Sequence, residues 1–113
     1  HDKLVFVPKG AIMDVVLDLR KESKTFKQFI SVELSAFNQK SIFIPKGCAH
    51  GFKTLVNDSI TVYNVSTEYD FNFDFGIHFN SIGFDWAIES PIVSNRDKNF
   101  IELDAFCLNT PFK

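Results

Sequence analysis

Apolar and polar residues alternate along several stretches of the first 65 residues. In residues 12–20 (IMDVVLDLR), apolar side chains of one parity alternate with charged side chains of the other: Met13, Val15, Leu17 and Leu19 against Asp14, Asp18 and Arg20. Because successive side chains of a strand point to opposite faces, this pattern predicts a half-buried strand. One face would meet a core, and the acidic face would be wet or would line a site. Residues 29–35 (FISVELS) repeat the alternation and predict a second strand.

Further short strands are expected in segments bounded by turn-forming residues. They are residues 3–7, 41–44, 52–56 and 59–65. No sustained helical period occurs before residue 86, whereas residues 95–106 predict one short C-terminal helix, because Phe100 and Leu103 fall near one face. Strands without βαβ alternation favour an all-β fold, an antiparallel sandwich, barrel or jelly roll. No linker divides the chain, so residues 1–113 are expected to form one domain.

Two similar Pro-Lys-Gly stretches predict strand-to-strand turns, residues 6–11 (FVPKGA) and residues 43–52 (FIPKGCAHGF). In the second, Pro45 restricts φ and Gly47 supplies a permissive backbone, so these two residues explain the turn. They do not explain His50, which follows the turn between two apolar segments.

Composition and charge exclude several classes of partner. The formal net charge is −2 and the basic residues are scattered, which gives no electrostatic surface for nucleic acid or an anionic membrane. No apolar run approaches the roughly 20 residues that span a bilayer, and no signal peptide is recognised, so a cytoplasmic protein is expected. In that compartment Cys48 and Cys107 are expected to be reduced thiols. The aromatic residues are 14 Phe against two Tyr and one Trp, which draws attention to the tyrosines.

Metal, nucleophilic and phosphate-loop chemistry find little support in the spacing of residues. His1, His50 and His78 form no pair with metal-ligand spacing, and a site without metal or other cofactor is expected. Cys48 and His50 would share one side of a strand, but no nucleophile motif surrounds them. Proton transfer remains, with Lys3, His50, Tyr63, Tyr69 and Asp97 as available groups. From spacing alone, a tyrosine such as Tyr63 is more often a packing residue with a satisfied hydroxyl than an acid catalyst.

Five stretches occur in an order that resembles the dTDP-4-dehydrorhamnose 3,5-epimerase family. They are KLVFVPKGAIMDVVLDLRKESKTF, VELSAFNQKSIFIPKGCAHGF, VYNVSTEY, IGFDW and SPIVSNRDKN. The resemblance implies a cupin-type jelly roll that forms a homodimer and needs no metal. It also implies a nucleotide-linked 4-keto-6-deoxyhexose as substrate, inverted at C3, C5 or both for deoxysugar and polysaccharide biosynthesis.

The resemblance also implies roles for individual residues. Tyr63 matches the family's acid, Tyr69 a second active-site tyrosine, and Lys3 the lysine that stabilises the enolate. His50 matches a histidine of the substrate pocket. Asp97 matches the aspartate that orients the base histidine, as in other His–Asp dyads.

Two departures from the family pattern bear on activity. The base histidine belongs to an RG-x-H motif upstream of the lysine, and that motif is not in this chain. A catalytically degenerate barrel that binds a sugar nucleotide is therefore the alternative. In residues 69–80 (YDFNFDFGIHFN) the chain has Phe71, Asp74 and Phe79 where the family has Pro, Glu and Trp, and His78 is interpreted as a surface substitution.

Overall fold

Six antiparallel strands form the framework of the computed structural model, which describes residues 2–66, 77, 79–87 and 92–107. The strands are β1 (Lys3–Lys9), β2 (Ala11–Asp18), β3 (Phe29–Ser35), β4 (Ser41–Ile44), β5 (Cys48–Thr54) and β6 (Ile60–Val65). A 3-10 helix (Phe79–Ser81) and two short helices, α1 (Asn95–Lys98) and α2 (Leu103–Cys107), follow them. The expected all-β fold is confirmed.

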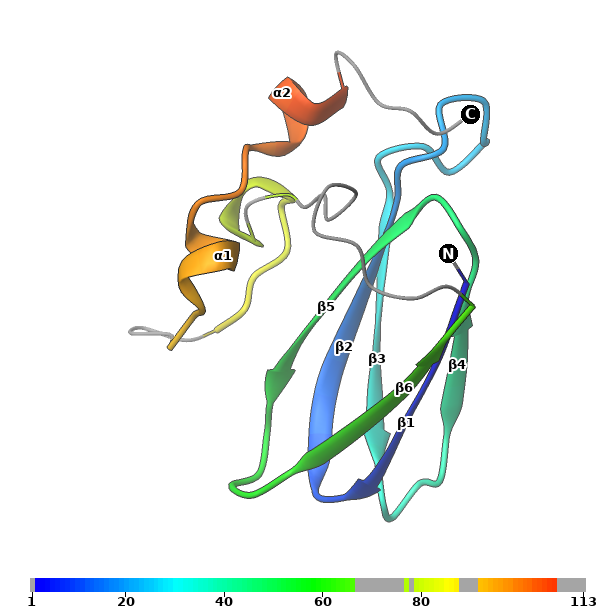
Figure 1. The fold of residues 1–113 in the computed structure, drawn as a ribbon, viewed down its shortest axis with the longest axis vertical. Helices are drawn as coiled ribbons and strands as arrows, with labels where there is room; N and C mark the ends of the chain where they lie inside the picture. Colours follow the sequence, from blue (N-terminus) through cyan, green and yellow to red (C-terminus); the bar gives the residue numbers. More distant parts are fainter. Residues whose placement is uncertain (1, 67–76, 78, 88–91, 108–113) are drawn as a thin grey trace.

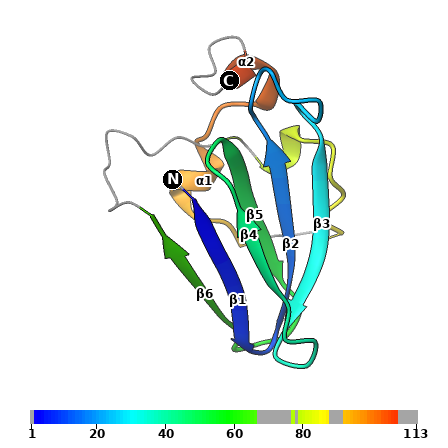
Figure 2. The same ribbon diagram turned by 90° about the vertical axis from the view of Figure 1, so that its right-hand side faces the viewer.

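The strands form two three-stranded sheets that face each other, with the orders β4-β1-β6 and β3-β2-β5 (Figures 1 and 2). Among these strands, only β2 and β3 are consecutive neighbours within one sheet; each other connection passes from one sheet to the other. Repeated crossing between two sheets is characteristic of a jelly roll.

Both Pro-Lys-Gly stretches are turns of the same kind, because each carries the chain from one sheet to the other. Gly10 joins β1 to β2 and Gly47 joins β4 to β5, with φ of 82° and 94°. Non-glycine side chains rarely adopt such backbone conformations. The first turn is also crowded, since a Cβ on Gly10 would lie 2.8 Å from the Cβ of Ser59. The predicted turns are confirmed, and neither closes a hairpin.

Two apolar clusters lie on opposite faces of β2. Between the sheets, the buried residues are Val5, Val7, Ile12, Leu34 and Ile44. On the outer face of the β3-β2-β5 sheet, Leu17 and Leu19 pack against Leu103 of α2, together with Ala49, Ile77 and Ile82. The described residues that follow β6 (77, 79–87 and 92–107) are called the C-terminal segment. This segment therefore packs on the outer face of the sheet.

This arrangement corrects the expectation that β2 is only half-buried. Asp14 is 0 % exposed and Asp18 is 6 % exposed, so the acidic face of β2 is shielded from solvent. It shares its side of β2 with Ile12, which lies between the sheets. The inner face of β2 can still line a site, as expected. The opposite, apolar face with Leu17 and Leu19 is covered by the C-terminal segment.

Two expected elements also have different bounds in the structure. The strand expected at residues 52–56 is β5, which already begins at Cys48, so His50 lies inside a strand. The single helix expected at residues 95–106 is two short helices, α1 and α2, separated by residues 99–102. Among the described residues, none of the helices is long and apolar enough to cross a membrane.

Candidate active site

A buried histidine–aspartate pair joins β5 to β2 on the inner face of their sheet. In the antiparallel register His50 lies opposite Val16, and Asp14 lies opposite Phe52, so the two residues are diagonal neighbours. His50 Nε2 is hydrogen-bonded to Asp14 Oδ1. The side chains of His50 and Asp14 are 7 % and 0 % exposed. Two polar groups are thus held together in the interior of the sandwich.

The carboxylate of Asp14 determines how the His50 ring is used. An ionised carboxylate can only accept a hydrogen bond, so Nε2 carries the hydrogen that it donates, and Nδ1 is the nitrogen left to face other groups. Asp14 Oδ2 is buried and has no hydrogen-bond partner among the described residues. Leaving a buried carboxylate without its hydrogen-bond donor is costly, so the bond to His50 stabilises the buried Asp14.

Lys3 and Tyr63 lie on the inner face of the opposite sheet. Lys3 is opposite Val65, and Val5 is opposite Tyr63, so Lys3 and Tyr63 are diagonal neighbours across β1 and β6. Lys3 also pairs with the buried Ile44, which identifies this parity as the inner one. Tyr63 is 55 % exposed. The two sheets therefore present a lysine and a tyrosine on one inner face and the His50–Asp14 pair on the other.

The remaining predicted site residues are placed less completely. Asp97 lies in α1, and its backbone N–H donates a hydrogen bond of 3.2 Å to Ser94 Oγ, so Ser94 caps the N-terminus of this helix. Its side chain is half-buried. Tyr69 and His78 lie outside the described residues, as do Phe71 and Asp74.

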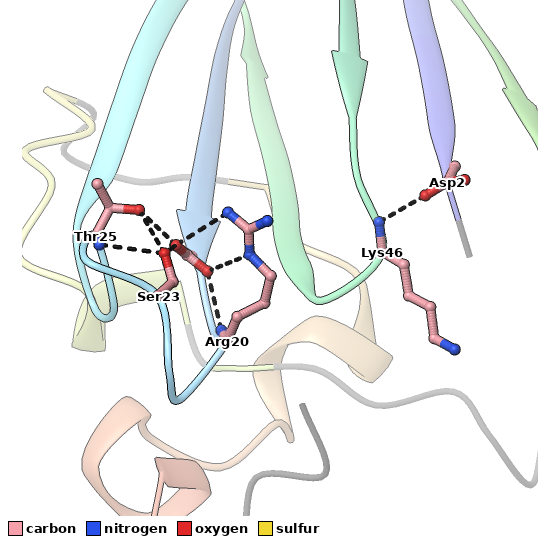
Figure 3. A network of polar contacts seen from close by, with 6 residues as sticks. Asp2, Arg20, Ser23, Thr25 and Lys46 are labelled. Atoms are coloured by element: carbon pink, nitrogen blue, oxygen red, sulfur yellow. Dashed lines mark hydrogen bonds and ion pairs between the residues drawn. The ribbon is translucent and has the colours of Figure 1, made fainter. Parts of the chain in front are cut away.

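A second polar cluster closes the β2–β3 loop at one end of the sandwich (Figure 3). The carboxylate of Asp18 accepts from the backbone N–H and Nε of Arg20, both at 2.9 Å, from Ser23 Oγ at 2.6 Å, and from Thr25 Oγ1. Burial alone would raise the pKa of Asp18, but the hydrogen bonds from Arg20, Ser23 and Thr25 outweigh it and hold that pKa well below its usual range. The cluster fixes the loop at the same end as Asp2, which accepts from the backbone N–H of Lys46 at 2.7 Å (Figure 3).

The structure argues against a cysteine nucleophile. Cys48 is a free thiol, and it shares the inner parity of His50 on β5. Burial raises the pKa of Cys48, although the positive charge of Arg20 acts in the opposite direction. A reactive cysteine needs a lowered pKa, whereas burial shifts the pKa of Cys48 in the opposite direction. Among the described residues, no group of three or more His, Cys, Asp or Glu side chains gathers as metal ligands.

Asp14 is the site residue that sequence reasoning missed. It was grouped with Asp18 and Arg20 on the polar side of a strand, without a chemical role. A signal was present, because an isolated carboxylate with Ile12 and Val16 on its own side of a strand is expected to have a buried partner. His50 has suitable chemistry, but residues 48–51 show no alternation that predicts the strand placing it beside Asp14.

These features define a cupin-type jelly roll with a His–Asp pair, a lysine and a tyrosine on its inner faces. A model of the dTDP-4-dehydrorhamnose 3,5-epimerase family matches residues 1–105. The chain therefore belongs to the dTDP-4-dehydrorhamnose 3,5-epimerase family, and the resemblance found in the sequence is confirmed.

Individual relatives agree with this assignment. The chain is 37 % identical over 109 residues to dTDP-4-dehydrorhamnose 3,5-epimerase of Shigella flexneri, covering 92 % of this chain and 60 % of the relative. A crystal structure of the Bacillus anthracis dTDP-4-dehydrorhamnose 3,5-epimerase, with TDP and PPi bound, superposes with a TM-score of 0.88 at 43 % identity, covering 90 % of this chain and 59 % of that one.

The Legionella pneumophila epimerase, solved with dTDP-4-keto-L-rhamnose, superposes with a TM-score of 0.86 at 35 % identity, covering 91 % of this chain and 56 % of that one. The chain thus spans between 56 and 60 % of the length of these relatives.

Proposed function

We propose that the protein containing this chain epimerises a nucleotide-linked 4-keto-6-deoxyhexose at C3, C5 or both. The observation that carries the proposal is the placement of Lys3 and Tyr63 on one inner face of the jelly roll and His50 with Asp14 on the other. Family membership supports the same chemistry, and the ligands named for the Bacillus and Legionella relatives support a dTDP-sugar as substrate.

The reaction needs groups on two sides of a sugar ring. The C4 ketone acidifies the hydrogens on C3 and C5, so a base can remove one of them and leave an enolate. A proton returned from the opposite face inverts the carbon, which requires an acid on that side. The enolate oxygen also needs a cation or hydrogen-bond donor close to it.

We assign these roles to the residues in accordance with their chemistry. Tyr63 is the acid that returns the proton, and Lys3 supplies the positive charge for the enolate oxygen. His50 binds the substrate through Nδ1, while Asp14 holds its ring in one orientation. Asp97 is assigned to orient the base histidine, and Tyr69 to the second tyrosine position of the site. No cofactor is included in this mechanism.

Solvent isotope exchange tests the proposal directly. The native-length protein is incubated in D₂O with dTDP-4-keto-6-deoxyglucose, and deuterium at C3 and C5 is followed by NMR and mass spectrometry. Incorporation at one or both carbons is expected, and the labelled positions tell a 3-epimerase from a 3,5-epimerase. Binding of the sugar nucleotide without any incorporation would reject the epimerase in favour of the catalytically degenerate barrel.

We also propose that the protein is a cytoplasmic homodimer. Leu4 and Phe43 are register partners on the outer face of the β4-β1-β6 sheet, and they are 40 % and 62 % exposed. An exposed apolar sheet face of this kind supports a protein partner. Sedimentation equilibrium of the native-length protein is expected to give the mass of a dimer, and a monomer at micromolar concentration would reject this part of the proposal.

A further inference from the structure

The strand that carries His50 is held in its sheet from one side only. Among the described strands, β5 pairs with β2 and with no other. An edge strand with one neighbour opens more easily than a central strand. The bond between His50 and Asp14 therefore depends on whatever else keeps β5 against β2.

One residue of the C-terminal segment contacts the outer face of β5 at two positions. Gly51 and Lys53 point outward, alternating with the inward-facing His50 and Phe52. A Cβ on Gly51 would lie 3.6 Å from Cη2 of Trp86, so the indole covers this glycine. Lys53 Nζ donates a hydrogen bond of 2.6 Å to the backbone carbonyl of Trp86. Trp86 thus lies directly behind the part of β5 that carries His50.

Trp86 is itself fixed by polar and aromatic contacts. Its Nε1–H donates to the carbonyl of Phe79 at 2.9 Å. Its ring meets that of Phe84 edge to face, with centroids 4.8 Å apart at 85°, and that of Phe79 at 6.3 Å and 74°. Such edge-to-face pairs add stabilisation beyond the apolar area they bury.

The aromatic contacts extend to the other edge of the same sheet. Phe84 also meets Phe29 of β3 edge to face, with centroids 5.6 Å apart at 82°. Phe29 lies opposite Leu17 of β2, and Leu17 lies opposite Ala49 of β5. Phe29, Phe84 and Trp86 therefore form an aromatic brace across the outer face of the sheet, from the edge strand β3 to the edge strand β5.

We propose that Trp86 is a positioning residue, which holds β5 against β2 so that His50 keeps its bond to Asp14. The indole lies close over Gly51, at a distance where even a Cβ would make only an ordinary contact of 3.6 Å. The inference rests on the geometry of the His50–Asp14 pair, and only its kinetic consequence rests on the proposed function.

The test compares Trp86→Ala with Trp86→Phe in the native-length protein, and Phe37→Ala serves as the control because Phe37 is 97 % exposed. Hydrogen exchange is measured for amides of β5 and β1, and the tautomer of His50 is read from ¹⁵N–¹H NMR without substrate. His50→Gln identifies the His50 signals.

In Trp86→Ala, exchange in β5 is expected to accelerate at least about tenfold relative to β1, which corresponds to about 1.4 kcal/mol of local opening. The single Nε2–H form of His50 is expected to give way to a mixture of tautomers. Trp86→Phe should restore most of both properties, and Phe37→Ala should change neither. If the wild type epimerises the sugar nucleotide, as deuterium incorporation into the substrate would show, the kcat of Trp86→Ala should fall with little change in KM.

Two results would overturn the inference. One is an unchanged His50 tautomer with unchanged β5 exchange in a folded Trp86→Ala protein. The other is equal acceleration in β5 and β1, which would mean that Trp86 stabilises the whole fold without positioning His50. Should Trp86→Ala fail to fold, Lys53→Met removes only the hydrogen bond to the Trp86 carbonyl, and the same comparison of β5 with β1 decides. Amide hydrogen exchange and the His50 tautomer are measured without substrate, so their outcome tests this inference separately from the epimerase proposal.

Discussion

His50 and Asp14 are 36 residues apart in the chain, yet Nε2 of the histidine is bonded to Oδ1 of the aspartate in the interior between the two sheets. The antiparallel pairing of β2 with β5 brings them together as diagonal neighbours. Because both side chains are buried, the pair has consequences for stability as well as for the chemistry of the site.

Replacing His50 alone is expected to destabilise the fold. In His50→Leu the Asp14 carboxylate is left buried without a partner, which typically costs about 3 to 5 kcal/mol in the free energy of unfolding. Replacing both residues with apolar groups removes the unpaired charge, so His50→Leu combined with Asp14→Leu should recover most of the loss. Urea unfolding of the two single variants and the double variant measures this, and additive losses would contradict a coupled pair.

The Asp18 cluster predicts a loss of stability in acid. The folded pKa of Asp18 is held below its unfolded value of about 4. Its contribution is therefore fully present above about pH 4 and is lost as the pH falls toward the folded pKa. Asp18→Asn should lower the free energy of unfolding at pH 7, and its difference from the wild type should shrink by pH 3. Thermal unfolding across this range tests it.

Glu22→Gln is the matched control for this prediction, because Glu22 is an exposed acidic residue of the same loop. Its free energy of unfolding should stay within about 0.5 kcal/mol of the wild-type value at every pH, as is usual for surface substitutions. An Asp18→Asn protein that differs from the wild type by the same amount at pH 3 and pH 7 would contradict the assigned cause.

The turn between β1 and β2 is expected not to tolerate a side chain. Gly10→Ala must adopt a positive φ and place its Cβ 2.9 Å from the Cα of Ser59, so a loss of more than about 1 kcal/mol is expected. Gly51→Ala is the control, since its Cβ would meet Trp86 at an ordinary contact distance of 3.6 Å. In denaturant unfolding, the free energy of unfolding of Gly10→Ala should be well below that of Gly51→Ala. Equal free energies would show that the turn can shift to accommodate a side chain.

Tyr63→Phe should separate proton removal from inversion. If Tyr63 is the acid, its loss should reduce formation of the inverted product by about 10² to 10⁴. Exchange of the substrate hydrogen with solvent should continue, because the base acts on the other side of the sugar. The phenol lies on a half-exposed side chain, so the melting temperature should change little. NMR of the reaction in D₂O measures both rates, and inversion at the wild-type rate would remove Tyr63 from the mechanism.

Local patterns along the chain predicted most of the strands. The alternation in residues 29–35 and the turn-bounded apolar segment 41–44 gave bounds that coincide with β3 and β4. This succeeds because the two-residue period of a strand is a local property of the backbone. The beginning of β5 was missed, since Ala49, His50 and Gly51 lack the apolar contrast that marks a half-buried strand.

The C-terminal helix was only partly predicted. Leu103 was expected on an apolar face, and it does pack on the outer face of β2. The expected continuous helix is interrupted at residues 99–102, where Ile101 instead forms a bridge with Ile77. A contact between residues 24 positions apart competes with helix formation, and no local pattern reports it.

For this protein, the sequence by itself determined that strands predominate, where most of them lie, and which side chains share a parity. It also identified the family through five ordered stretches. Only the tertiary structure decided which parity of β2 faces the interior, because a period of two is equally satisfied by either face. The C-terminal segment covers Leu17 and Leu19, which leaves Asp14 between the sheets, and strand register, a non-local property, then places it against His50.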